Sequence, residues 1–244
     1  RREPLPAAPP RIARGRFADD MRSRPDVTEF DGYVPQAGPV LDPAGPHVAY
    51  SVTELEKTAE CPFRFFVKRG LGIRAVDERE RSRDIWLDPL SRGSALHDVY
   101  AAMLRKTRDE SRRPQEADHA WLRQYAEALL DEMHVETPAP SAEVFERERD
   151  EFLADVALFL DHEIEDNSRR AIGLEVAFGR PFGEHEEPLA STEPASLNLA
   201  RGITLRFAGR IDRVNELSPD TFEVLDYKTG GYYRNDWTGT FKGG

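Results

Sequence analysis

Two strand-like runs near the C-terminal end constrain the fold more than any other part of the chain. Over residues 203–212, apolar residues alternate with more polar ones, which is the periodicity of a strand with one apolar face. A second run spans about residues 222–228, and the connection at 215–221 contains Pro219 among other turn formers. Because this connection is short, we expect an antiparallel hairpin.

The two predicted strands carry three charged residues towards one end of the hairpin. Asp212 stands near the end of the first strand and Asp226 near the end of the second, with Lys228 two positions later. Residues two apart in a strand point to the same face, so Asp226 and Lys228 should project together near Asp212. Two carboxylates and an ammonium group can bind a divalent cation and orient an attacking water.

An ordinary surface hairpin with three solvated charges is the alternative interpretation. Asp226 and Lys228 follow the apolar residues Val224 and Leu225, where a purely solvated pair of charges is less expected. Spacing alone gives the two interpretations roughly even weight.

The same residues resemble motifs of the PD-(D/E)xK nuclease superfamily, in its RecB and AddB-type branch. Residues 209–213, Gly-Arg-Ile-Asp-Arg, match the first carboxylate motif, and residues 226–230, Asp-Tyr-Lys-Thr-Gly, match the second. Upstream, Cys-Pro-Phe-Arg-Phe-Phe at 61–66 and Arg-Gly-Ser-Ala-Leu-His at 92–97 resemble segments of AddB-type nucleases, as does Phe-Asp-Gly at 30–32 more weakly. The resemblance covers about residues 30–230.

The resemblance implies a fold and an activity. The fold would be α/β, with a restriction-endonuclease-like core in which α-helices flank a small mixed β-sheet and a helical subregion precedes the catalytic hairpin. The activity would be metal-dependent hydrolysis of phosphodiester bonds in DNA, by an exonuclease module that serves DNA repair and recombination. In this branch the nuclease often belongs to a helicase subunit, so DNA and a helicase domain or subunit are the expected partners.

The resemblance also implies a site. Asp212, Asp226 and Lys228 would be catalytic, and a metal ion would be held by His97, Asp212, Asp226 and the carbonyl oxygen of Tyr227. Oxygen ligands favour Mg²⁺, and an added imidazole makes Mn²⁺ a good substitute.

Two candidate ligands have surroundings that also allow an ordinary structural role. His97 lies at the edge of a helical apolar stripe, where a lone histidine is more often a packing residue, and without its motif it would be a ligand in roughly one case in five. The motif around it favours a ligand. Glu175 lies between Leu174 and Val176 on a predicted strand at 172–178. A solvated position explains it at least as well as a metal ligand, so it is left out of the predicted site.

Cys61 is the one cysteine of the chain. In many AddB-type nucleases this cysteine holds an iron–sulfur cluster together with three later cysteines, which are missing here. One thiolate cannot supply the four ligands, so a cluster is expected only if a longer parent provides three more cysteines. A single cysteine agrees with a reducing cytoplasm, and without a long apolar run we expect no membrane association.

Net charge complicates the DNA-binding interpretation. The chain carries −11, whereas DNA binding relies on lysine and arginine contacts to phosphates. Basic residues concentrate in 61–83 and acidic residues in about 127–166, which permits a basic channel on an acidic body or reliance on a partner for DNA contact. Solvated helix faces are the usual explanation of such runs.

Two parts of the chain are expected. Residues 1–48, rich in proline and arginine, would form an extended arm or linker, and residues 49–244 would form the nuclease domain. The family's last helix, with its glutamine and tyrosine, has no match, so the domain is expected to be truncated at its C-terminal end. Predicted helices cover about residues 51–69 with a break at Pro62, 91–107, 116–134 and 141–167, and a loop covers 183–200.

A nuclease-like scaffold without catalysis is the second functional hypothesis. Such a protein would bind DNA or a helicase partner. The unmatched C-terminal elements and the acidic charge favour it. The presence of Asp212, Asp226, Lys228 and His97 together favours the enzyme, because a scaffold has no need of all four.

Overall fold

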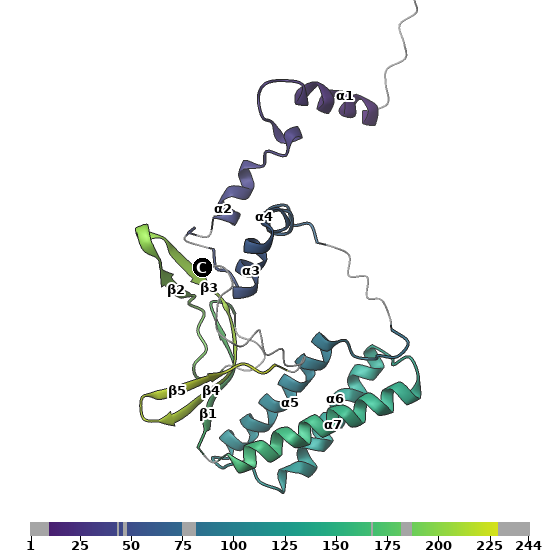
Figure 1. The fold of residues 1–244 in the computed structure, drawn as a ribbon, viewed down its shortest axis with the longest axis vertical. Coiled ribbons are helices and arrows are strands. Elements are labelled where there is room, and N and C mark those ends of the chain that lie inside the picture. Colours follow the sequence, from purple (N-terminus) through teal and green to yellow (C-terminus); the bar gives the residue numbers. More distant parts are fainter. Residues whose placement is uncertain are drawn as a thin grey trace, which may run out of the picture. The chain divides into compact units, whose positions relative to one another are not determined.

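The computed structural model describes six stretches of the chain. They are residues 10–42, 44–45, 48–74, 82–166, 168–181 and 187–228. The chain divides into two compact units, shown by colour along the sequence in Figure 1. The first unit comprises Arg1–Ala75 with Ser196–Arg206, and the second comprises Val76–Ala195 with Phe207–Gly244.

Three long helices form one side of the second unit. They are α5 (Pro89–Asp109), α6 (Asp118–Glu136) and α7 (Ala142–Glu165). The side chain of Asp88 accepts hydrogen bonds from the first backbone N–H groups of α5, and Ser141 does the same for α7, which satisfies donors that a helix start leaves unpaired. These helices confirm the expected helical subregion ahead of the hairpin.

Apolar side chains at helical spacing make the core between the three helices. Burying such side chains removes apolar surface from water, which stabilises the unit by about 1.5–3 kcal/mol for each large side chain. The fully buried residues of this core include Leu96, Met103, Leu122, Leu130, Phe152 and Leu160.

A three-stranded antiparallel sheet lies beside these helices (Figure 1). Its order is β1 (Arg170–Phe178), β4 (Gly209–Ser218), β5 (Thr221–Leu225), so β4 is the central strand. Helix α5 packs against β1, where Leu104 and Leu174 share a small buried cluster. The arrangement confirms the predicted α/β fold. The ladders between described strands are antiparallel, and one isolated parallel bridge joins Phe178 to Ser191.

The predicted hairpin is present as β4 and β5, with different limits. The run expected to be one strand is interrupted at Ala208, so that β3 (Thr204–Phe207) pairs instead with β2 (Ala195–Asn198), inside the segment predicted to be a loop. Strand β4 then continues to Ser218, which makes the predicted loop start at residue 215 wrong and leaves a turn at residues 219–220.

Glycine is required where β4 begins. A Cβ added to Gly209 would lie 3.0 Å from the ring of Phe178, its pairing partner on β1. A side chain there would therefore push the two strands apart. This close approach explains why β4 starts at this residue.

The first unit consists of short helices and the pairing of β2 with β3. Ser51 and Glu54 form the capping box expected for α3, and Pro62 starts a new helix, as predicted. The expected extended arm differs from the structure at residues 10–22, which are helical. The helices of this unit are α1 (Pro10–Arg22), η1 (Glu29–Asp31), η2 (Pro35–Ala37), α2 (Gly38–Leu41), α3 (Val52–Glu60), α4 (Pro62–Phe65), the π-helix η3 (Phe66–Gly70) and η4 (Ala200–Gly202).

Among the helices of the described residues, none combines the length and the apolar character needed to cross a membrane.

Phe152→Ala should lower the free energy of unfolding by about 3–5 kcal/mol, because it leaves a cavity between the three helices. The matched control is Leu158→Ala on the same helix, where the side chain is 68% exposed and the change should stay within about 0.5 kcal/mol. Urea denaturation followed by circular dichroism measures both. Equal losses in the two variants would contradict the assignment of the core.

Candidate active site

Three side chains from three elements of the second unit meet at one point. His97 comes from α5, Glu175 from β1 and Asp212 from β4, and their possible ligand atoms all lie within 4.8 Å of one another. The Nδ1 atom of His97 is 3.6 Å from Glu175 Oε1 and 3.6 Å from Asp212 Oδ2. All three side chains are partly buried, which strengthens the electrostatic interactions among them.

Pairing of β1 with β4 places the two carboxylates. Leu174 pairs with Arg213 and Val176 with Ile211, so Glu175 stands across from Asp212. Glu175 has a φ of 49°, a left-handed conformation that is rare within a strand. Such a backbone costs about 1–3 kcal/mol and often occurs at functional positions.

The backbone of Tyr227 joins two members of this cluster. Its N–H donates to Asp212 Oδ2 at 2.8 Å, and its carbonyl oxygen lies 3.1 Å from His97 Nε2. A carbonyl only accepts, so this contact places the ring proton of neutral His97 on Nε2. Nδ1 then faces the carboxylates as an acceptor, free to bind a cation or a proton.

Charge and burial shift the protonation of this cluster. Contact with Glu175 raises the pKa of His97, with help from the charge of Asp212. Burial raises the pKa of Asp212, and the charge of Asp226 adds to the increase. Burial also acts to raise the pKa of Glu175, but hydrogen bonds from His97 and Arg210 outweigh it and keep that pKa below its usual value. Crowded carboxylates of this kind favour a bound positive charge.

The other two predicted catalytic residues lie outside the cluster. Asp226 and Lys228 follow the end of β5, are exposed, and form an ion pair with each other. The structure therefore brings together His97, Asp212 and the backbone of Tyr227 from the predicted set. It leaves Asp226 and Lys228 out of the group whose atoms lie within 4.8 Å of one another.

Two further predictions concern residues elsewhere. Cys61 belongs to the first unit, where its Sγ accepts from the Arg64 N–H at 3.5 Å as the cap of α4. Residues 229–230, the end of the second predicted motif, lie outside the described residues.

Glu175 is the residue that the sequence reasoning left out. A carboxylate between two apolar neighbours on a strand was the available signal, and it did not distinguish a ligand from a solvated position. The deciding facts are its left-handed backbone and its place across from Asp212. Both depend on strand pairing, which the sequence alone does not show.

A buried carboxylate behind the cluster joins α5 to β1. The Glu187 side chain is only 2% exposed and forms ion pairs with Arg105, at 2.8 Å, and with Arg108, both on α5. It also accepts from the Leu174 N–H at 3.2 Å, next to Glu175. Because this one residue contacts both elements, it holds His97 and Glu175 in a fixed relation.

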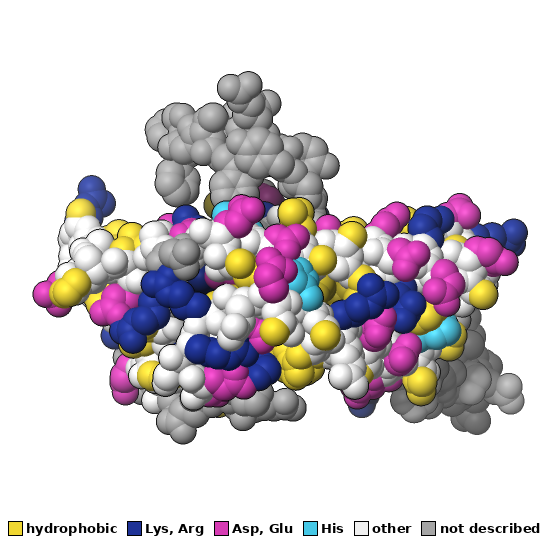
Figure 2. Space-filling model, turned by 90° about the horizontal axis from the view of Figure 1, so that it is seen from below, with side chains coloured by type: hydrophobic (Ala, Val, Ile, Leu, Met, Phe, Trp, Pro, Cys, Tyr) yellow, Lys and Arg dark blue, Asp and Glu magenta, His cyan; other side chains and the backbone are white. Residues whose placement is uncertain are grey.

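Charged side chains of both signs are intermixed on the face shown in Figure 2. That face does not display the continuous basic channel that the sequence permitted. Two of the arginines counted towards such a channel, Arg79 and Arg81, lie outside the described residues.

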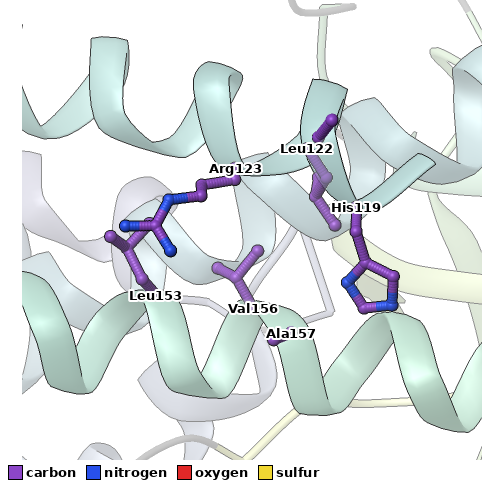
Figure 3. Close-up of a pocket in the computed structure, with 7 residues that line it drawn as sticks. His119, Leu122, Arg123, Leu153, Val156 and Ala157 are labelled. Carbon is purple, nitrogen blue, oxygen red and sulfur yellow. The ribbon is translucent and has the colours of Figure 1, made fainter. Parts of the chain in front are cut away.

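A hollow between α6 and α7 is separate from the cluster (Figure 3). It has a volume of about 270 Å³ and an apolar wall that includes Leu122, Leu153 and Val156, with His119 and Arg123 also lining it. None of its lining residues belongs to the group formed by α5, β1 and β4. The hollow is a packing feature of the helices.

Comparison with known proteins identifies the family. The model of the PD-(D/E)XK nuclease superfamily matches residues 49–242, which is most of the chain. The protein therefore belongs to the PD-(D/E)XK nuclease superfamily, which confirms the resemblance drawn from the motifs.

Curated relatives agree with the AddB-type branch. The AddB-type ATP-dependent helicase/deoxyribonuclease protein of Caldanaerobacter subterraneus subsp. tengcongensis is 28% identical over 196 residues, covering 76% of this chain and 16% of the relative. The protein with the same name from Clostridioides difficile is 24% identical over 189 residues, covering 74% of this chain and 15% of the relative. The chain thus spans about a sixth of the length of the curated relatives it matches.

Glu187→Gln should lower the free energy of unfolding at neutral pH by about 3 kcal/mol, because it leaves two arginines without a buried partner charge. Burial acts to raise the pKa of Glu187, but hydrogen bonds from Arg108 and Arg105 outweigh it and hold that pKa below its ordinary value of 4.5. The stabilisation is therefore complete above that value and is lost as the pH falls through the lower, folded-state pKa.

Urea titrations of wild type and Glu187→Gln between neutral pH and about pH 3 measure this difference. Glu110→Gln, which alters an exposed ion pair on the same helix end, is the control and should change the transition little. A wild-type advantage that grows as the pH falls would contradict the assigned charge on Glu187.

Proposed function

We propose that this chain is a metal-dependent deoxyribonuclease, an AddB-like exonuclease module that hydrolyses phosphodiester bonds in DNA repair and recombination. The observation that supports it best is the meeting of His97 and Asp212 with the backbone of Tyr227, since these residues come from separate motifs of the family that the chain belongs to.

The donor set fits a small divalent cation. Two carboxylates and one imidazole lie within 4.8 Å, partly buried, with an excess of negative charge. Carboxylate oxygens suit Mg²⁺, and the imidazole makes Mn²⁺ an acceptable substitute. We propose His97, Asp212, Asp226 and the Tyr227 carbonyl as ligands, with Glu175 as an additional acidic group at the same point.

A bound divalent cation would supply charge neutralisation at the scissile phosphate and activation of the attacking water. The chain's own residues would do the rest. The Tyr227 N–H orients the carboxylate of Asp212, and Glu175 keeps the ring of His97 in place. Lys228, at the exposed edge, would orient the water and stabilise negative charge as it develops in the transition state.

The names of the relatives support the choice of partners. They are proteins of an ATP-dependent helicase/deoxyribonuclease, so we propose DNA as substrate and a helicase domain or subunit as partner. A location in the cytoplasm accompanies this proposal.

A scaffold without catalysis is the second candidate function. The pairing of Lys228 with Asp226 outside the cluster, together with the net charge of −11, favours it. A scaffold would not need the cation, so it would bind Mn²⁺ weakly and to the same extent when Asp212 is replaced.

Metal-dependent cleavage should be lost in Asp226→Ala and in Lys228→Ala, with little loss of DNA binding, because these changes remove catalytic charges and leave the core intact. The measurement is cleavage of end-labelled linear DNA with Mg²⁺, Mn²⁺ or EDTA, beside a binding assay in Ca²⁺. Glu110→Gln serves as the control on an exposed charge. Cleavage that persists in Asp226→Ala would refute its role.

A comparison of Glu175→Gln with Asp226→Asn should show which carboxylate completes the metal site. If Glu175 supports the site from its present position, Glu175→Gln should raise the Mn²⁺ dissociation constant about tenfold, while Asp212→Asn abolishes binding. Isothermal titration calorimetry measures both. An unchanged dissociation constant in Glu175→Gln would remove Glu175 from the site.

A further inference from the structure

A buried charged residue lies directly behind the candidate site. Arg213 follows Asp212 on β4 and therefore points to the opposite face of the sheet. Its side chain is 2% exposed and forms a two-pronged ion pair with Glu163 of α7, with Nη2 lying 2.9 Å from Oε2. Its Nε also donates to Asn215 Oδ1 at 2.6 Å. Every arm of the guanidinium is thus engaged.

One of these arms reaches the site through Tyr227. The Arg213 Nη1 group donates to the hydroxyl oxygen of Tyr227 at 3.2 Å. The ring of Tyr227 packs at right angles to the rings of His97 and Tyr100. Tyr227 is therefore held at its tip by Arg213, while its backbone contacts Asp212 and His97.

Tyr227 needs such an anchor because the ladder ends before it. Leu225 is the last residue of β5 and pairs with Arg213, so residues 226–228 have no strand pairing in the described part of the chain. A backbone without a ladder partner is free to change its dihedral angles. The hydrogen bond from Arg213 to the Tyr227 hydroxyl restrains it from the side opposite the site.

Stability alone does not explain the Arg213–Glu163 pair. Taking two charges out of water is costly, and well-packed apolar residues of similar size are often as stable or more so. An apolar residue could not donate to a hydroxyl group, however. The directional contact with Tyr227 is what the charged pair provides and an apolar pair does not.

We propose that Arg213, oriented by Glu163, is a positioning residue that fixes Tyr227 and through it the relation between Asp212 and His97. The inference rests on the proposed function, because it assigns the residues that keep that same site in its metal-binding geometry. It adds an ion pair of α7 and β4 to a site whose groups come from α5, β1, β4 and the segment after β5.

The test uses two variants and a matched control. Glu163→Gln removes the charge that orients Arg213 without touching the site, and Tyr227→Phe removes only the hydroxyl acceptor. Asp118→Asn is the control, since Asp118 is buried and forms a two-pronged pair with Arg112 that does not contact the site. Thermal unfolding of all three shows how much each variant loses in stability.

The Mn²⁺ dissociation constant should rise about tenfold in Glu163→Gln and in Tyr227→Phe. In Asp118→Asn it should stay within about twofold of wild type, whatever the loss of stability. The double variant should be no weaker than the weaker single variant, because both changes break one contact. Wild-type affinity in both single variants, or an equal loss in the control, would overturn the proposal.

A second readout separates this inference from the nuclease proposal. In metal-free protein, the imidazole resonances of His97, assigned with a His97→Gln variant, should move in Glu163→Gln and stay in place in Asp118→Asn. Unchanged Mn²⁺ binding in Asp212→Asn would refute the metal site while leaving the positioning contact to stand on these resonances. Resonances that stay in place in Glu163→Gln would refute the positioning contact instead.

Discussion

Pairing of β4 on both of its edges is the constraint from which the rest of the site follows. On one edge, β1 brings Glu175 across from Asp212. On the other, Leu225 pairs with Arg213, so the chain leaves β5 in time for the Tyr227 N–H to reach Asp212. A slip of one residue in either register would turn Asp212 towards the helices and Arg213 towards the site.

Charge is arranged in layers around that strand. At the site, carboxylates crowd together and are only partly offset by His97 and Arg210, so the cluster keeps a demand for positive charge. Behind it, the buried charges of Glu187 and Arg213 are fully paired. An unpaired buried charge would destabilise the fold, whereas an incompletely neutralised, partly exposed cluster can be satisfied by a ligand.

Local patterns in the sequence predicted the hairpin, the helices and the meeting of His97 with Asp212. These succeed because alternation, caps and motifs are properties of short segments, as in the capping box at Ser51. The break at Ala208 and the left-handed Glu175 were not predictable in the same way. Each is decided by which strand lies alongside. Helix α1 was missed because its segment shows little apolar periodicity.

Adjacent residues of the Gly-Arg-Ile-Asp-Arg motif perform different tasks on opposite faces of one strand. Asp212 belongs to the cluster, and Arg213 connects it to α7 through Glu163. Since neighbouring strand residues alternate in direction, a motif of this length can contain both a site residue and its support. A match to such a motif therefore supports more than a ligand. It also indicates that a buried partner must exist on the element that packs behind the strand, and Glu163 is that partner in this chain.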